Sequence, residues 1–330
     1  MKNLQNMHIL LLENIHPFAK ELFEKEKFLV ESLKTTLSLD QLKQKLGHIH
    51  VLGIRNKTQI TQEILDSAPH LMAVGCFCVG TDQVHLESAQ FKKIPVFHAS
   101  FGNTRSVTEF TIAQIICLAR QIIEKNQEMH QKIWNKTSSH CHEIHGKVLG
   151  VIGYGHIGSQ VSMIAEALGM KVQFYDFLPK NPLGNAKRCE TLEECLSSSD
   201  FITLHLPSTI QTFHLLSFPQ FQFMKKGAYL INTSRGSTIH LPALIKALET
   251  GHLAGAAIDV FPNEPENHQA RFITELQGLS HVILTPHIGG STEEAQFRIA
   301  QEVSTALIHF IQTGSTLGAI NFPKVNSRTA

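Results

Sequence analysis

The sequence predicts an α/β protein with two parallel-sheet domains. Residues 8–102 alternate short apolar runs with amphipathic helical segments, as the βα units of a parallel sheet do. Residues 148–176 repeat this alternation around a glycine-rich turn. The chain has 330 residues, of which 42% are hydrophobic, which is enough for about two domains with separate cores.

The first half of the chain is expected to form a flavodoxin-like sheet. Its five apolar runs are predicted strands at 8–12, 28–30, 50–54, 71–75 and 93–97. Helices are expected at 19–23, 38–46 and 61–68. The third strand ends in a polar loop that contains Arg55 and Lys57. Ligands bind at this end of the strands in open α/β sheets, so the loop is a candidate binding segment.

A strand, a glycine turn, a helix and a second strand follow one another at 148–176. In this context Gly153 allows the tight turn, Gly155 lets the backbone approach a pyrophosphate, and Gly158 lets the helix pack close to the strand. Asp176 ends the second strand, where a carboxylate accepts hydrogen bonds from the adenosine ribose of a dinucleotide. Because a carboxylate repels a 2′-phosphate, the pattern predicts NAD rather than NADP.

Further strands and helices are expected on both sides of this motif. A single long helix is expected over 103–128, and its broad apolar face predicts contact with a partner subunit as well as with its own domain. Strands are expected at 200–206, 228–232, 256–260 and 282–285, and helices at 242–249 and 292–311. A polar, structureless end is expected at 324–330.

Three polar residues follow apolar strands of the second half. They are Arg235, Glu264 and His287. Since the carboxyl ends of parallel strands meet at one edge of a sheet, these side chains are expected to lie together beside the nicotinamide. An arginine binds a carboxylate through two hydrogen bonds, a histidine transfers a proton near neutral pH, and a neighbouring glutamate orients the histidine.

These motifs together resemble the D-isomer-specific 2-hydroxyacid dehydrogenases. The segments that carry the resemblance lie at 75–81, 100–107, 134–136, 153–158 with Asp176, 233–236, 259–265, 286–291, 314–316 and 321–323. Within the family the similarity is to the branch of bacterial, serine-regulated type that oxidises 3-phosphoglycerate. The resemblance implies two Rossmann/flavodoxin-like domains, with a cofactor domain at 103–289 inserted into a substrate domain made of 1–102 and 290–330.

The resemblance also implies roles for individual residues. His287 would transfer the proton, Glu264 would pair with it, and Arg235 would hold the substrate carboxylate, which makes these three the catalytic residues. Cofactor contacts are implied for Gly153, Gly155, His156, Ile157, Gly158, Asp176, Thr233, Ser234, Arg235, Asp259, His287, Ile288, Gly289 and Gly290. Of these, Asp259 would hold the nicotinamide carboxamide. Substrate contacts are implied for Arg55, Lys57, Val79, Gly80, Asn103 and Arg235.

The implied reaction is the NAD-dependent oxidation of D-3-phosphoglycerate to 3-phosphohydroxypyruvate, the first step of L-serine biosynthesis. Two alternatives stay open: a dehydrogenase for another 2-hydroxy acid such as 2-hydroxyglutarate, and an NADH-sensing scaffold of the co-repressor kind. The chain departs from the branch in three places. Lys57 stands where a second arginine is usual, and His98 and Ser100 replace an asparagine and a proline. The branch continues after 321–323 into a serine-binding domain, so serine feedback through that domain is not expected here.

Composition limits the partners that can be expected. A net charge of +1 provides no basic field for nucleic acid or acidic lipid, and no apolar stretch reaches the length of a membrane span. We therefore expect a cytoplasmic protein. The resemblance implies a small, phosphorylated 2-hydroxy acid as substrate, and we expect a homodimer through the cofactor domain, with Trp134 reaching the neighbour. The six cysteines are expected as reduced thiols. Cys76 with Cys78, and the group His140, Cys141, His142 and His145, resemble metal ligands, but buried or loop residues are the preferred interpretation, and no metal is expected.

Overall fold

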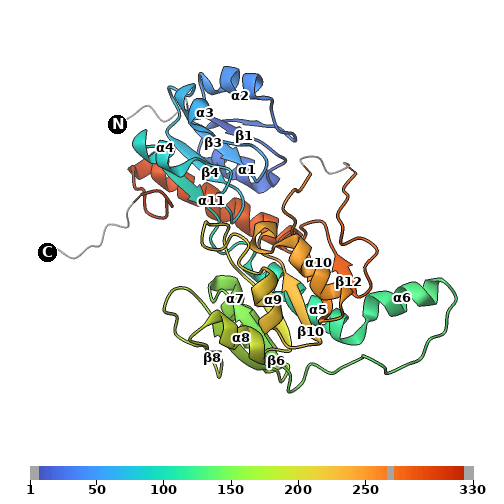
Figure 1. Cartoon of the computed structure of the whole chain (residues 1–330). Coiled ribbons are helices and arrows are strands. Elements are labelled where there is room, and N and C mark those ends of the chain that lie inside the picture. Colours follow the sequence, from blue (N-terminus) through green and yellow to red (C-terminus); the bar gives the residue numbers. More distant parts are fainter. Residues whose placement is uncertain (1–6, 266–270, 323–330) are drawn as a thin grey trace. The chain divides into compact units, whose positions relative to one another are not determined.

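The computed structural model describes residues 7–265 and 271–322, and these divide into two compact units (Figure 1). Unit 1 comprises Met1–Asn103 and Thr292–Ala330, and unit 2 comprises Thr104–Ser291. Unit 2 is thus one continuous stretch that interrupts unit 1 in the sequence. The boundaries expected from the sequence, after residues 102 and 289, lie within two residues of these divisions. The polar end expected at 324–330 lies outside the described residues.

Unit 1 contains a five-stranded parallel sheet with the strand order β2-β1-β3-β4-β5. Its strands are β1 (His8–Leu11), β2 (Leu29–Ser32), β3 (Val51–Ile54), β4 (Ala73–Cys76) and β5 (Val96–His98). Its helices are α1 (Pro17–Lys25), α2 (Leu39–Leu46), α3 (Gln62–Asp66), α4 (Leu86–Phe91) and α11 (Glu293–Thr313). The predicted flavodoxin-like sheet is confirmed.

Helices cover both faces of the unit 1 sheet, as the alternation of side chains along a strand requires. In β1, Ile9 and Leu11 point into a core formed with α1 and α11. Leu10, between them, points into the opposite core, formed with α2, α3 and α4. Helix α11 therefore returns the chain to unit 1 and covers one face of the sheet together with α1 (Figure 1).

Unit 2 contains a seven-stranded parallel sheet with the strand order β12-β11-β10-β9-β6-β7-β8. Its strands are β6 (Val148–Ile152), β7 (Lys171–Tyr175), β8 (Lys187–Arg188), β9 (Phe201–Leu204), β10 (Ala228–Asn232), β11 (Leu253–Ile258) and β12 (Val282–Leu284). Its helices are α5 (Thr104–Arg120), α6 (Ile122–His130), α7 (His156–Ala167), α8 (Leu192–Ser198), α9 (Phe218–Phe223) and α10 (Leu241–Glu249), with a 3₁₀ turn, η2, at Gly236–Thr238.

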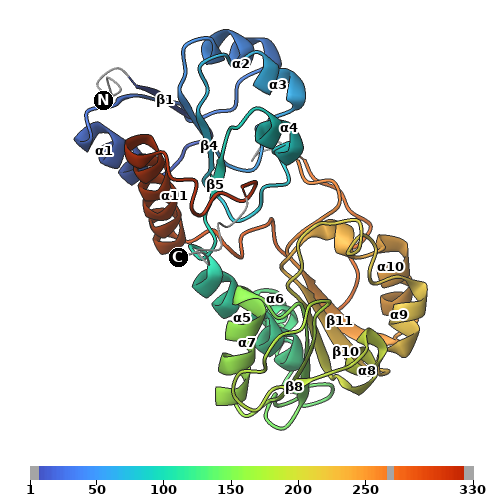
Figure 2. The ribbon, with the colours of Figure 1, turned by 90° about the vertical axis from the view of Figure 1, so that its left-hand side faces the viewer.

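The two faces of this sheet are also covered by different helices. Helices α5 and α7 pack on one face, around Val151 and Phe174. Helices α8, α9 and α10 pack on the other, around Ile202 and Leu230 (Figure 2). The chain leaves β6 toward β7 on one side and later returns to β9 on the other side of β6. This reversal is the point at which doubly wound sheets bind dinucleotides.

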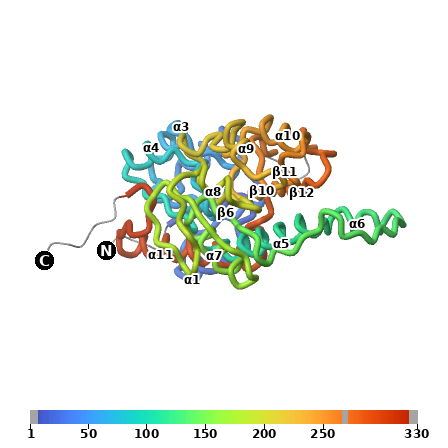
Figure 3. The backbone as a smooth tube through the Cα atoms, turned by 60° about the horizontal axis from the view of Figure 1, so that its bottom comes forward, coloured from blue at the N-terminus to red at the C-terminus, as the bar shows by residue number. Residues whose placement is uncertain are grey.

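The expectation of one helix over 103–128 is wrong at Gln121. This residue has a left-handed backbone (φ +52°), and the axes of α5 and α6 differ by 66°. The chain that returns after α6 provides the reason, because the His142 N–H donates to the Ala119 carbonyl, which a continuing helix would have used itself (2.7 Å). Helix α6 extends away from the rest of unit 2 (Figure 3), and none of its residues is buried.

Three helices were not expected from the sequence. They are α4, α8 and α9, each of six or seven residues. A segment of fewer than two turns shows no clear 3.6-residue period. Within the described part of the chain, no single helix combines the length and apolar character needed to cross a membrane, and α5 with α6 meets that criterion only as a bent pair.

Candidate active site

The glycine turn between β6 and α7 is shaped so that a phosphate group can approach it. A Cβ at Gly153 (φ +93°) would stand 2.4 Å from the His205 carbonyl oxygen, and one at Gly158 would stand 2.1 Å from the Gly153 carbonyl oxygen. The fold itself therefore requires these two glycines. A Cβ at Gly155 would meet nothing within 4 Å, so its lack of a side chain leaves open space in front of the first turn of α7, which begins at His156. The first N–H groups of a helix have no acceptor within it, and a pyrophosphate fits this space.

Asp176 lies at the end of β7, beside that turn. Its Oδ2 accepts a hydrogen bond from the Tyr154 N–H (2.7 Å), and its Oδ1 accepts one from the Leu178 N–H (2.9 Å). These contacts fix the carboxylate, and each oxygen keeps a lone pair for another donor. Two ribose hydroxyls are suitable donors, so the residues present fit NAD.

Arg235 is presented by a turn that a buried asparagine organises. The Asn232 side chain, fully buried at the end of β10, donates to the Arg235 carbonyl (3.0 Å) and accepts from the Ser234 N–H and hydroxyl (3.0 and 2.8 Å). The Thr233 hydroxyl lies 3.2 Å from that of Thr111 on α5. Asn232 was not among the predicted site residues. The signal for it was present, because an amide directly after four apolar strand residues needs partners when it is buried.

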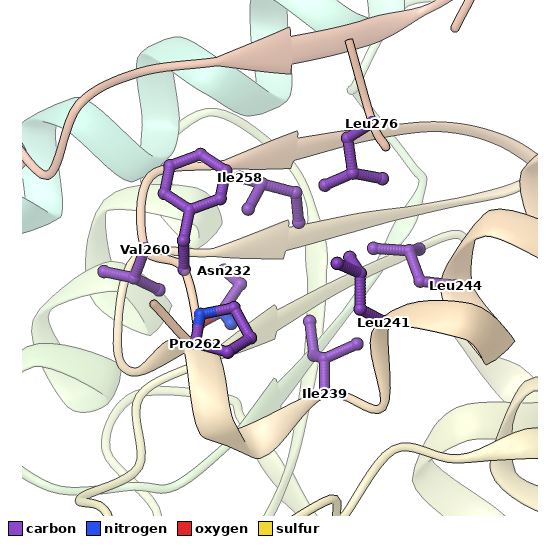
Figure 4. A pocket seen from close by; sticks show the side chains of 10 residues that line it. Asn232, Ile239, Leu241, Leu244, Ile258, Val260, Pro262 and Leu276 are labelled. Carbon is purple, nitrogen blue, oxygen red and sulfur yellow. The ribbon is translucent and has the colours of Figure 1, made fainter. Parts of the chain in front are cut away.

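Gly236, directly after Arg235, lets this turn pack against the segment that leads to Glu264. A Cβ at Gly236 would stand 2.0 Å from the Phe261 carbonyl carbon, so no other residue fits. The two segments close over a small apolar pocket (Figure 4) lined by Asn232, Gly236, Ile239, Leu241, Leu244, Ile258, Val260, Phe261, Pro262 and Leu276. The pocket belongs to the core beneath the site and has few polar groups, so it is not a candidate for the polar substrate.

His287 and Glu264 form the predicted pair. His287 Nδ1 lies 2.7 Å from Glu264 Oε2, and both side chains are about one-third exposed (38% and 31%). Burial raises the pKa of Glu264, but the hydrogen bond and charge of His287, with the charge of Arg235, outweigh it and hold the pKa below its ordinary value. With Glu264 accepting from Nδ1–H, Nε2 is left to face a substrate. Both His287 and Arg235 thus act on the Glu264 carboxylate within unit 2.

Asp259 shapes the turn that carries His287. Its buried carboxylate accepts hydrogen bonds from the Thr285 hydroxyl (2.6 Å) and from the Ile288 and Gly289 N–H groups (both 2.9 Å). The Asp259 carbonyl also accepts from the His287 N–H (2.8 Å). His287 itself has a left-handed backbone (φ +55°), a conformation that non-glycine residues keep only where surrounding contacts impose it. The Asp259 carboxylate therefore accepts hydrogen bonds from three donors of the chain itself. Its predicted contact with the nicotinamide carboxamide stays a prediction.

The predicted substrate residues of unit 1 lie at the carboxyl ends of neighbouring strands. Arg55 and Lys57 follow β3, and Val79 and Gly80 follow β4, which is paired with β3. Arg55, Lys57, Val79 and Gly80 are all partly exposed. The Val79 carbonyl lies 2.8 Å from His98 Nδ1. His98, which replaces the asparagine usual in the family, therefore contacts this loop.

Asn103 is the last residue of unit 1 before α5. Its Oδ1 is buried and accepts no hydrogen bond from the described residues. Cys76 is buried in β4, Cys78 is partly buried just after it, and neither forms a disulfide within the described residues. No group of three or more histidine, cysteine, aspartate or glutamate side chains in the described ranges could hold a metal ion.

Comparison with known proteins identifies the family. The family model for the NAD-binding domain of the D-isomer specific 2-hydroxyacid dehydrogenases matches residues 112–289. D-3-phosphoglycerate dehydrogenase of Dictyostelium discoideum is 50% identical over 317 residues, which make up 96% of this chain and 78% of that protein. The enzyme of the same name from Escherichia coli K12 is 45% identical over 318 residues, with the same coverage of 96% and 78%. The chain belongs to the D-isomer specific 2-hydroxyacid dehydrogenase family, as the sequence motifs predicted.

The solved structures agree with the fold class. The crystal structure of D-lactate dehydrogenase from Aquifex aeolicus, complexed with NAD and lactic acid, matches with a TM-score of 0.84 and 27% identity. The match covers 96% of this chain and 100% of that one. Two parallel-sheet α/β domains are therefore confirmed, and the family assignment makes the chain an NAD-dependent dehydrogenase of 2-hydroxy acids.

Proposed function

We propose that the chain oxidises D-3-phosphoglycerate to 3-phosphohydroxypyruvate with NAD, the first step of L-serine biosynthesis. The observation that carries this proposal is the pairing of His287 with Glu264 near Arg235 in unit 2. Relatives named D-3-phosphoglycerate dehydrogenase, 45–50% identical over most of the chain, support the choice of substrate. The cations Arg55 and Lys57 in unit 1 suit a substrate with a second anionic group.

Each residue of the site has a role that follows from its chemistry. Arg235 binds the substrate carboxylate, and Arg55 with Lys57 binds the phosphate. His287 Nε2 takes the proton of the C2 hydroxyl, while Glu264 accepts from Nδ1–H and so keeps the imidazole oriented. Gly153–Gly158 and Asp176 would hold NAD, which would supply the acceptor for the hydride of C2. In the reverse direction His287 returns the proton to the carbonyl oxygen.

The test is a panel of 2-oxo acids with NADH and with NADPH, followed by loss of NADH absorbance. We expect the highest kcat/KM with 3-phosphohydroxypyruvate and NADH. A higher kcat/KM with 2-oxoglutarate would favour the alternative in which the two cations bind a distal carboxylate. Absence of turnover with every acid would favour the NADH-sensing scaffold.

We also propose that the chain forms a homodimer through unit 2. Helix α6 and the segment after it expose Ile122, Ile123, Met129, Ile133 and Trp134, and the side chain of Trp134 is 78% exposed. Several large exposed apolar side chains on one segment favour a partner surface. Light scattering should give twice the chain mass for the wild type and a lower mass for the Ile133→Ser/Trp134→Ser double variant. An unchanged mass would contradict this interface. The cytoplasmic location stays a prediction.

A further inference from the structure

Glu13 is a buried carboxylate at the carboxyl end of β1. Only 6% of it is exposed. Its Oε2 accepts a hydrogen bond from the Lys57 N–H (3.0 Å), and its Oε1 accepts one from the Thr58 N–H (2.8 Å). The donors lie 44 and 45 residues further along the chain, and they come within reach because β1 and β3 are neighbours in the sheet. Glu13 therefore ties down the loop that carries Arg55 and Lys57.

The backbone that presents Glu13 is itself fixed. Glu13 and the following Asn14 both have left-handed conformations, with φ of +66° and +54°. Their N–H groups donate to the carbonyls of Thr35 (3.3 Å) and Leu33 (3.1 Å). Non-glycine residues keep such a conformation only where tertiary contacts impose it. The position of the Glu13 carboxylate is consequently fixed by its own backbone and does not depend on the loop of residues 55–58.

The opposite end of the loop is held by other side chains. The Arg55 carbonyl accepts hydrogen bonds from the buried Gln83 amide and from the Cys78 thiol, the latter at 3.4 Å. The Gly80 carbonyl lies 3.1 Å from the same sulfur and is the alternative acceptor for its single proton. The main chain is thus fixed at residues 55, 57 and 58, while the Arg55 and Lys57 side chains remain partly exposed to solvent. A cationic loop whose backbone is fixed in advance loses little freedom when an anion binds.

We propose that Glu13 is a positioning residue that makes this loop selective for a substrate with a distal phosphate. The inference rests on the proposed function, because it assigns the loop to the phosphate of that substrate. By holding the N–H groups of residues 57 and 58, Glu13 turns the loop so that the Arg55 and Lys57 side chains face a common anion. Glu13 does not contact the substrate and takes no part in proton transfer.

The variant Glu13→Gln separates this role from general packing. Glutamine keeps the volume of the side chain, but its NH₂ group faces one of the two N–H donors and cannot accept from it. The side-chain NH₂ group and a backbone N–H group then face each other in a buried position, and the loop must move to separate these two donors. Glu13→Asp provides a second variant, which keeps the charge but is too short to reach both N–H groups.

The experiment compares 3-phosphohydroxypyruvate with hydroxypyruvate, which lacks the distal phosphate, as substrates with NADH. We expect the ratio of the two kcat/KM values to fall about tenfold in Glu13→Gln, through a higher KM for the phosphorylated substrate. The kcat with hydroxypyruvate and the KM for NADH should stay at wild-type values. Glu13→Asp should lower the ratio in the same direction, so the test remains available if the glutamine variant does not fold.

Asp200→Asn is the matched control. The Asp200 carboxylate also holds a loop, accepting from the Val148 N–H (2.8 Å) and from Lys225 Nζ (3.1 Å), but it lies at the amino end of the unit 2 sheet. This variant should lower the melting temperature and leave the substrate ratio unchanged. An equal loss with both substrates in Glu13→Gln would show a merely structural role and overturn the inference. If the wild type turned over neither substrate, the proposed function would fail, whereas a ratio equal in wild type and variant would overturn the role of Glu13 alone.

Discussion

In unit 2, buried side chains fix the turns that carry a proton-transfer pair, whereas in unit 1 they fix a loop that carries permanent positive charge. Asp259 accepts from the N–H groups of Ile288 and Gly289, and Glu13 accepts in the same way from Lys57 and Thr58. Both carboxylates follow the end of a parallel strand and hold two consecutive N–H groups. The same local device therefore serves acid–base chemistry in one unit and charge recognition in the other.

This difference predicts different kinetic consequences. Changes at the turns of unit 2 should mainly lower kcat, because they disturb groups that act in the transition state. Changes at the loop of unit 1 should mainly raise KM for a phosphorylated substrate, because the charge binds ground state and transition state alike. Four predictions test this division, from the largest expected effect to the smallest.

The variant His287→Ala should lose the most activity. We expect kcat to fall by about 10²–10⁴-fold with little change in the KM for NADH, because general acid–base catalysis is removed while the cofactor site stays intact. Steady-state kinetics with 3-phosphohydroxypyruvate measures both constants. His309→Ala, an exposed position on α11, is the control. A His287→Ala enzyme that kept more than one tenth of the activity would exclude this histidine as the proton-transfer group.

Two glycines of the β6–α7 turn should respond in opposite ways. Gly158→Ala places a methyl group 2.1 Å from a backbone carbonyl, so we expect a loss of stability of about 1–3 kcal/mol, measured as a lower melting temperature. Gly155→Ala meets no atom of the chain, so the melting temperature without cofactor should not change, while the Kd for NADH should rise about tenfold. Unchanged NADH binding in Gly155→Ala would contradict the placement of the pyrophosphate at this turn.

Lys57→Met tests the cationic loop of unit 1. We expect the KM for 3-phosphohydroxypyruvate to rise about tenfold, with kcat retained, because a charge-assisted contact to the phosphate is lost. Hydroxypyruvate should be reduced as by the wild type. Lys20→Met, on the exposed side of α1, should change neither constant. A large fall in kcat would show that the loop of unit 1 does more than bind the phosphate and would contradict the proposed division of roles between the units.

The smallest effect concerns acid stability. Burial lowers the pKa of His205, at the end of β9, to about 3, and burial with the charges of His8, His70 and His48 lowers the pKa of His50 in unit 1. In both cases the unfolded chain binds more protons than the folded one as the pH falls below about 6.5, so the free energy of unfolding decreases toward acid.

Melting temperatures between pH 7.5 and pH 5 should therefore fall less steeply in His205→Gln and in His50→Gln than in the wild type. We expect the larger change for His205, whose Nδ1 is buried without a hydrogen-bond partner in the described part of the chain. Equal slopes in all three proteins would show that neither histidine limits acid stability. A larger change for His50 would indicate that unit 1 is the first to unfold.

Much of the fold could be predicted because it depends on local patterns. All strands except β8, which is the basic pair Lys187–Arg188, contain short apolar runs. The glycine turn with Asp176 is a motif whose spacing reflects its geometry. What was missed lacks a local pattern. Helices α4, α8 and α9 are too short to show a period, and α5 ends at Arg120 because a residue more than twenty positions later uses the Ala119 carbonyl.

The features of the site also divide into those that the sequence predicts and those that only the tertiary structure decides. The sequence by itself determined the family, the use of NAD and which residue types stand at the strand ends, including Arg235, Glu264 and His287. Only the tertiary structure decided how these ends are held: by Asn232 under the arginine turn, by Asp259 under the histidine turn, and by Glu13 under the loop of Arg55 and Lys57. The physical reason is that a buried amide or carboxylate must find donors, and the donors that Asp259 and Glu13 find lie as far as 30 and 45 residues away, where no spacing rule reaches.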